Sequence, residues 1–145
     1  MAGKGKYYES QFEEATIELL RESHWQYTFG DDIHRKYTDP LIEEDLRTFL
    51  AAQYKNKKLT ASEMDGIVAN LRNTGGQNDY YALQNTFLLY RDGYDFTYSD
   101  GRDNPFRLQY IDFEHPDHNI FRCVNQFVME QGRENRRPDI LLFVN

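Results

Sequence analysis

The sequence predicts an α/β fold in which helices come first and a mixed, mostly antiparallel sheet follows. Apolar residues recur at helical spacing through the first half of the chain. After Gly93 the period changes to two, which is typical of strands. The apolar run Ile140–Val144, bounded by Pro and Asn, predicts a final buried strand. We therefore expect a single domain over residues 1–145, with a helical insertion over about residues 38–91.

The first predicted element is a helix from Tyr8 to Ser23. Its apolar residues fall at i, i+4, i+7 and i+11 and define one face; they are Tyr8, Phe12, Ala15 and Leu19. At about 100° per residue, Glu13 falls inside the wide apolar arc that these residues and Ile17 define. A glutamate on an inner face is unusual. The alternative is that Glu13 lies at the edge of the arc and reaches solvent.

Three further helices make up the predicted insertion. The T-D-P sequence at residues 38–40 is a helix-start signal, with Asp as the cap and Pro in the first turn. A capping-box pattern, T-x-x-E, over Thr60–Glu63 begins the next helix, and Gly75-Gly76 ends it. The third helix is expected over residues 78–90, where Asn and Asp precede apolar residues at helical spacing.

The sheet is predicted from short segments that turns separate. A strand followed by a loop is expected over residues 25–37, and alternation predicts a strand over residues 94–98. Two more strands are expected at Phe106–Phe113 and Ile120–Met129. A basic turn around Gly132 then leads into the last strand of the chain.

Composition narrows the classes of function. The single cysteine, Cys123, excludes a disulfide framework and a cysteine-based zinc site. The single cysteine also fits a reducing environment, so we expect a cytoplasmic protein. No run of 18 apolar residues is present, so we expect no membrane span. With 17 Lys and Arg against 24 Asp and Glu, the net charge is −7, which makes the chain by itself a poor binder of DNA.

The end of the chain carries a more specific pattern. Asn125-Gln126-Phe127 precedes Gly132 and the run RRPDILLFVN over residues 136–145. This pattern resembles the N-terminal nuclease region of the R subunit of type I restriction–modification enzymes, a member of the PD-(D/E)xK nucleases. The resemblance implies a restriction-endonuclease-like core. In that family a Glu-x-Lys half of the motif lies on the following strand, whereas this sequence has six residues after Asp139 and neither Glu nor Lys among them. We therefore expect a chain truncated before that half.

The resemblance also implies an activity and its partners. The parent protein would cleave double-stranded DNA with Mg²⁺, coupled to translocation by an ATP-driven motor whose ATP site lies outside this chain. Its partners would be the DNA and the methylation and specificity subunits of the restriction complex. The chain by itself is expected to be inactive. A rival from another class is a non-catalytic docking module of a DNA-processing complex, in which a surface rich in tyrosine, of which the chain has 11, contacts a partner subunit.

Glu13 and Asp139 are the predicted catalytic and metal-binding residues. Two carboxylates that converge at the end of a strand supply the hard oxygen ligands that Mg²⁺ prefers. By resemblance, Asp139 belongs to the Pro-Asp half of the nuclease motif. The resemblance also points to Glu13, because nucleases of this superfamily commonly open with a helix that carries a glutamate on its inner face.

Two further clusters are candidate functional sites: one of arginines and one of two histidines with an aspartate. Arg133, Arg136 and Arg137 are predicted to contact DNA, since the forked guanidinium suits phosphate; the alternative is a solvated turn. A loop with His115, Asp117 and His118 could ligate zinc or supply a general base. Its Pro116 and Asn119 are ordinary turn formers and favour a plain turn.

Overall fold

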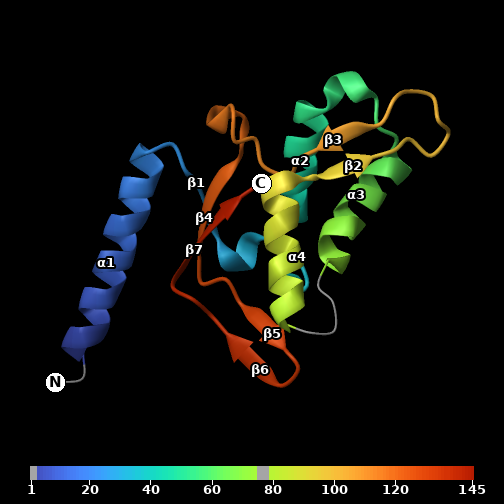
Figure 1. Ribbon diagram of the computed structural model, residues 1–145. Helices are drawn as coiled ribbons and strands as arrows, with labels where there is room; N and C mark the ends of the chain where they lie inside the picture. Colours follow the sequence, from blue (N-terminus) through green and yellow to red (C-terminus); the bar gives the residue numbers. More distant parts are fainter. Residues whose placement is uncertain (1–2, 75–78) are drawn as a thin grey trace. The chain divides into compact units, whose positions relative to one another are not determined.

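The computed structural model describes residues 3–74 and 79–145, and the chain divides into two compact units (Figure 1). Unit 1 combines Met1–Ile42 with Ile120–Asn145, and unit 2 is the continuous segment Glu43–Asn119. The described residues form four α-helices and three small sheets, which confirms the predicted α/β class. The helix-end signal at Gly75-Gly76 lies outside the described residues.

Unit 1 is built on a three-stranded mixed sheet with the order β1-β4-β7. Strand β1 (Gln26–Phe29) runs parallel to β4 (Phe121–Asn125), and β4 pairs antiparallel with β7 (Ile140–Val144). Segments from the two ends of the sequence therefore lie side by side, as the blue, orange and red strands of Figure 1 show. The predicted final strand is confirmed as β7. It is only half-buried, and Leu142 is 54% exposed, because β7 is an edge strand of the sheet.

The core of unit 1 lies against β4 and β7. Ile42, Val124 and Phe127 are buried there, and the partly buried side chains around them are Ile33, Met129, Leu141 and Phe143. The Phe127 and Phe143 rings pack with centroids 5.0 Å apart, and the Arg35 guanidinium lies 3.4 Å above the Phe127 ring. Arg35 also donates a hydrogen bond to the Val128 carbonyl, so this cation is both stacked and hydrogen-bonded.

The predicted strand Ile120–Met129 is two strands in the structure. Gln126 has a φ of 55°, in the left-handed region, and this conformation ends β4 one residue earlier. The chain then forms a small antiparallel hairpin of β5 (Met129–Gln131) and β6 (Glu134–Arg136). Gly132 supplies the positive φ of 63° that its turn needs, in the place where the basic turn was predicted.

Helix α1 (Gly3–Glu22) confirms the predicted first helix, but the predicted buried face is wrong. Phe12 is 71% exposed and Leu19 is 64% exposed, whereas Ile17 is buried. Glu13 is half-buried. The helix contacts the sheet through the side that carries Glu13 and Ile17, because polar groups at the end of β4 hold the Glu13 carboxylate there.

Unit 2 contains the other helices and a short hairpin. Its elements are α2 (Glu43–Gln53), α3 (Ala61–Asn73), α4 (Asp79–Asp92), β2 (Tyr94–Phe96) and β3 (Phe106–Leu108). Helix α2 begins after the predicted signal at residues 38–40, because Asp39 Oδ1 accepts from the Leu41 N–H and closes a turn ahead of the helix. Strand β3 is shorter than predicted, since Tyr110 leaves the hairpin and its hydroxyl donates to the buried Ile67 carbonyl at 2.7 Å.

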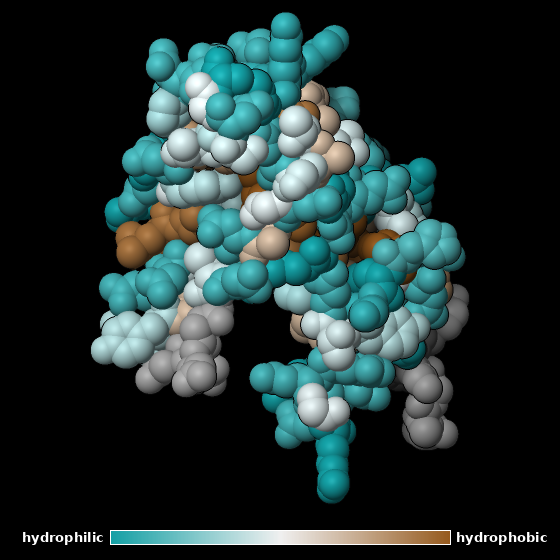
Figure 2. Space-filling view, turned by 90° about the vertical axis from the view of Figure 1, so that its right-hand side faces the viewer, coloured by the Kyte–Doolittle hydropathy of each residue, from teal (hydrophilic) through white to brown (hydrophobic). Residues whose placement is uncertain are grey.

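The surface is mostly hydrophilic, as the 28% of charged residues in the sequence leads one to expect. Figure 2 shows a face on which hydrophilic side chains cover most of the surface and hydrophobic ones emerge only in separate small areas. Within the two described stretches of chain, none of the helices combines the length and the apolar character that a bilayer crossing requires.

The predicted capping box at the start of α3 is present, and its buried glutamate also forms an ion pair with Arg102. Thr60 Oγ1 accepts from the Glu63 N–H, and the Glu63 carboxylate accepts from the Thr60 N–H. Arg102 donates from both terminal nitrogens to the two Glu63 oxygens at 2.7 Å each, and its guanidinium lies over the Tyr98 ring. The Glu63 side chain is 5% exposed, so this charge relies on Arg102 for compensation.

This ion pair predicts a pH-dependent stability. Hydrogen bonds from Arg102, followed by the capping bond, lower the pKa of Glu63 from 4.5 to about 2. Because folding lowers this pKa, the stabilising contribution is fully present above the unfolded value and is lost as the pH falls towards the folded one. We expect Arg102→Met to lower the free energy of unfolding at about pH 7 and to have a clearly smaller effect at about pH 2.5. Urea unfolding of both proteins at the two pH values checks this; an equal difference at both would contradict it.

Candidate active site

Glu13 reaches the sheet of unit 1 at the end of β4. Its Oε1 accepts a hydrogen bond from Asn125 Nδ2 at 3.0 Å and one from Gln126 Nε2 at 3.3 Å. Asn125 is itself held in place, because its Oδ1 accepts from the Tyr27 hydroxyl of β1 at 2.8 Å. The acid therefore belongs to a polar cluster that α1, β1 and β4 build together.

Asp139 lies directly before β7 and next to Asn125 and Gln126, the two residues that bind Glu13. Its backbone carbonyl accepts from the Gln126 N–H at 3.1 Å, and the next residue, Ile140, pairs with Asn125 in the sheet. The Asp139 side chain is exposed. Gln126 thus contacts both predicted site residues: its backbone binds Asp139 and its side chain binds Glu13.

The backbone at Asn125 and Gln126 is closely packed against Gly30. This glycine follows β1 and begins a short 3-10 helix, Gly30–Asp32. A Cβ at position 30 would lie 2.4 Å from the Gln126 carbonyl oxygen and 2.8 Å from that of Asn125. Glycine is therefore required here by close approach of two backbone segments, and the sequence gives no sign of this contact.

The arginines predicted to contact DNA are exposed. They lie in the β5–β6 hairpin and in the segment that follows it. Arg133 is in its turn, Arg136 ends β6 and Arg137 follows. Arg136 Nη2 is 3.8 Å from Glu134 Oε2, with both side chains more than three-quarters exposed, so this ion pair is weak. Arg136 lines a surface pocket of about 330 Å³ together with residues of the loop before α2 and of the hairpin; neither Glu13 nor Asp139 lines it.

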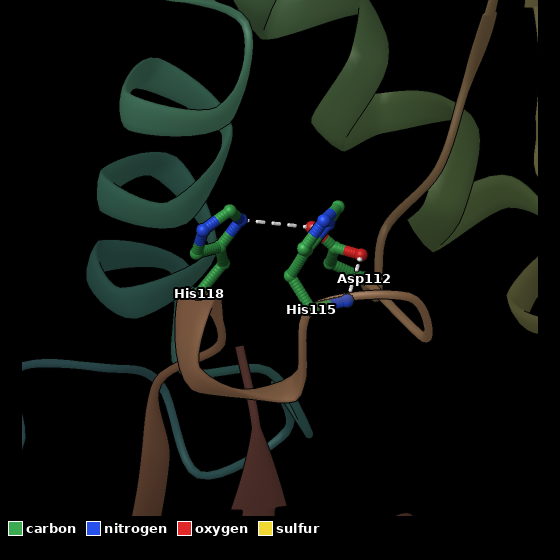
Figure 3. Close-up of side chains that lie close together, drawn as sticks. All are labelled: Asp112, His115 and His118. Carbon is green, nitrogen blue, oxygen red and sulfur yellow. Dashed lines mark hydrogen bonds and ion pairs between the residues drawn. The ribbon is translucent and has the colours of Figure 1, made fainter.

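A second cluster lies in unit 2 and consists of Asp112, His115 and His118 (Figure 3). The predicted turn is confirmed, since Pro116–His118 forms a short 3-10 helix. Asp117, which the sequence suggested as the acidic member, is exposed, and Asp112 occupies that role instead. The spacing of the three residues at i, i+3 and i+6 was the available signal for Asp112.

Asp112 is the buried centre of this cluster, with its side chain 6% exposed. Its Oδ1 accepts from the backbone N–H groups of Glu114 and His115, and its Oδ2 accepts from Gln53 Nε2 at 2.8 Å. The pKa of Asp112 lies well below its usual range, chiefly because the His115 N–H donates to it, with further hydrogen bonds from Gln53 and His118. The carboxylate is therefore ionised.

Two comparisons with known proteins both match the chain to type I restriction enzymes. A sequence profile described as the type I restriction enzyme R protein N terminus matches residues 6–145. The chain is also similar to the type I restriction enzyme HindI endonuclease subunit of Haemophilus influenzae, with 27% identity over 147 residues. That alignment covers 94% of this chain and 14% of the length of the relative. No solved structure matches the chain.

These matches confirm the resemblance that the run at residues 136–145 predicted. The profile extends over α1, unit 2 and the sheet of unit 1, and so includes Glu13 and Asp139. The chain belongs to the family of the type I restriction enzyme R protein N terminus.

Proposed function

We propose that this chain is the first part of a PD-(D/E)xK nuclease domain with a restriction-endonuclease-like core. In the parent R subunit it would serve Mg²⁺-dependent cleavage of double-stranded DNA, coupled to ATP-driven translocation. The observation that supports this most is the position of Asp139 directly before β7, where Gln126 is hydrogen-bonded to both Asp139 and Glu13. Helix α1 and the mixed sheet would form the part of the core that positions both acids.

The residues present fit a magnesium ion. Both candidate ligands are carboxylates, and hard oxygen donors are what Mg²⁺ takes from proteins. Asp139 offers an exposed carboxylate, and Asn125 and Gln126 fix the orientation of Glu13. When bound, the ion would polarise the scissile phosphate and lower the pKa of the attacking water. A third carboxylate and a lysine would come from the Glu-x-Lys half of the motif.

DNA binding would depend on other parts of the complex as well. Arg133, Arg136 and Arg137 are exposed and could contact phosphate near Asp139. The net charge of −7 nevertheless opposes non-specific binding by this chain. The motor of the parent protein and the methylation and specificity subunits would hold the DNA, and the complex would work in the cytoplasm.

Glu13→Gln in the parent complex tests the assignment. A glutamine keeps the shape of the side chain but loses the charge that a metal requires. A metal site supplies several kcal/mol of transition-state stabilisation, so we expect cleavage of a supercoiled plasmid with Mg²⁺ and ATP to slow at least about 100-fold. The matched control is Glu14→Gln, which alters an exposed neighbour on the same helix and should cleave normally. Wild-type cleavage by Glu13→Gln would remove Glu13 from the proposed site.

One observation favours the alternative of a docking module. Helix α4 exposes several large apolar side chains; they are Tyr80, Tyr81, Leu83 and Phe87, each at least 59% exposed. Exposed apolar side chains gathered on one element are typical of a surface that contacts a partner. Cleavage that depends on both acids would decide for the nuclease, and unchanged cleavage after substitution of both would decide for docking.

A further inference from the structure

The loop from Asp112 to Asn119 in unit 2 is closed by paired hydrogen bonds at its two ends. The Asp112 N–H donates to Asn119 Oδ1 at 2.9 Å, and Asn119 Nδ2 donates back to the Asp112 carbonyl at 2.8 Å. A 3-10 helix occupies the middle of the loop. This closure fixes the backbone that carries His115 and His118, so their side chains return to the carboxylate at the start of the loop (Figure 3).

The two oxygens of the Asp112 carboxylate have different partners. Oδ1 accepts from the Glu114 and His115 N–H groups, which is the ordinary role of an Asp that begins a turn. Oδ2 points the other way, towards the two imidazoles and the Gln53 amide. Formation of the turn therefore explains the partners of Oδ1 but not those of Oδ2. The second is a buried carboxylate oxygen that faces two ring nitrogens, a set of ligand atoms that turn formation does not require.

Two of the distances in this cluster are close to those between ligand atoms of a tetrahedral metal site. Asp112 Oδ2 is 3.0 Å from His118 Nδ1 and 3.5 Å from His115 Nδ1. Bonds of about 2.0–2.1 Å from a tetrahedral ion place two ligand atoms about 3.3 Å apart. One ligand atom from each of the three residues lies within 4.8 Å of the others. The imidazoles are stacked with centroids 4.9 Å apart, and both are exposed, so the rings can reorient towards a shared ion without disturbing the core.

We propose that Asp112, His115 and His118 bind a zinc ion. Two imidazoles and one carboxylate are ligands that zinc accepts, and a set of three leaves the fourth position for water or another small ligand. Gln53 of α2 would orient the carboxylate by the hydrogen bond it already donates to Oδ2. The bound ion would stabilise the loop in its position next to α2. Two nitrogen ligands disfavour Mg²⁺, which distinguishes this site from the all-carboxylate one proposed for cleavage.

Titration of the metal-free chain with Zn²⁺, and with Co²⁺ as a visible probe, tests this site. We expect one Zn²⁺ per chain, a Co²⁺ absorption spectrum of the tetrahedral type that Zn²⁺ abolishes, and a rise in the unfolding midpoint with Zn²⁺ concentration. Binding should persist in a large excess of Mg²⁺. His115→Gln and His118→Gln alter exposed side chains, so both should fold, and each should weaken Zn²⁺ binding at least about tenfold.

Two control variants separate this cluster from incidental binding. His34→Gln removes an exposed histidine of unit 1, and Asp117→Asn removes the exposed acid of the same loop; both should bind Zn²⁺ as the wild type does. Circular dichroism confirms that each variant is folded. Failure of the folded wild-type chain to bind Zn²⁺, equal binding by His118→Gln, or loss of binding in His34→Gln would each overturn the proposal.

Discussion

Asp139→Ala in the parent complex is expected to abolish DNA cleavage and to leave ATP hydrolysis intact. The reason is that Asp139 is proposed as a metal ligand for phosphodiester chemistry, whereas the motor proposed for the parent protein would lie outside this chain. Loss of the several kcal/mol that a metal supplies corresponds to at least about a 1000-fold fall in cleavage rate. The measurement is conversion of a supercoiled plasmid to its linear form, with ATP hydrolysis followed in the same reaction.

The structure makes this variant a clean test of chemistry. Asp139 contributes its backbone carbonyl, not its side chain, to the hydrogen bond with Gln126. Its side chain is exposed, so replacing it should change the free energy of unfolding by no more than about 0.5 kcal/mol. Asp117→Ala, an exposed aspartate of unit 2, is the matched control and should cleave normally. If Asp139→Ala cleaved at the control rate, the catalytic assignment would be wrong.

Gly30→Ala should damage both the stability of unit 1 and cleavage by the parent complex. The added methyl would lie 2.4 Å from the Gln126 carbonyl oxygen, a backbone atom that cannot rotate away. The segments must therefore separate, which costs about 1–3 kcal/mol or more of folding free energy. Because Asn125 and Gln126 hold the Glu13 carboxylate, their displacement should also slow cleavage well beyond the loss of folded protein.

Gly66→Ala is the control for this prediction because its expected effect has the opposite sign. Gly66 is in α3, and a Cβ there would meet nothing within 4 Å. Alanine should therefore stabilise the helix by about 0.5–1 kcal/mol and leave cleavage unchanged. Urea unfolding of the three proteins gives the stabilities. Wild-type stability and cleavage in Gly30→Ala would show that the close approach at Gln126 is not needed.

Local signals predicted the elements well where a short pattern determines the structure. Thr60 and Glu63 form the capping box that their spacing predicts, because both partners lie within one helical turn. The apolar run before Asn145 became β7 for a similar reason. The positive φ of Gln126, which splits the predicted strand after Ile120, had no such signal, since this conformation is more usual for glycine or asparagine.

Side-chain partners that are distant in sequence were harder to predict. The apolar stripe with Phe12 and Leu19 correctly indicated a helix but not its buried side, because hydrogen bonds from Asn125 and Gln126 determine which face meets the sheet. Asp112 was missed for a related reason. Its spacing from His115 and His118 was an available signal, but its approach to them depends on the loop closure by Asn119, a contact that the spacing does not show.

Unit 1 is built from two segments that are far apart in the sequence, and this affects how the protein folds during synthesis. The N-terminal strand β1 pairs with β4, and β4 leaves the ribosome only after the whole of unit 2 has been made. Unit 2 is continuous and can begin to fold during translation, whereas β1 must wait for a distant partner. We therefore expect nascent chains that have emerged from the ribosome as far as about Asn119 to hold a folded unit 2 and an unpaired β1, whose exposed strand edge chaperones would protect.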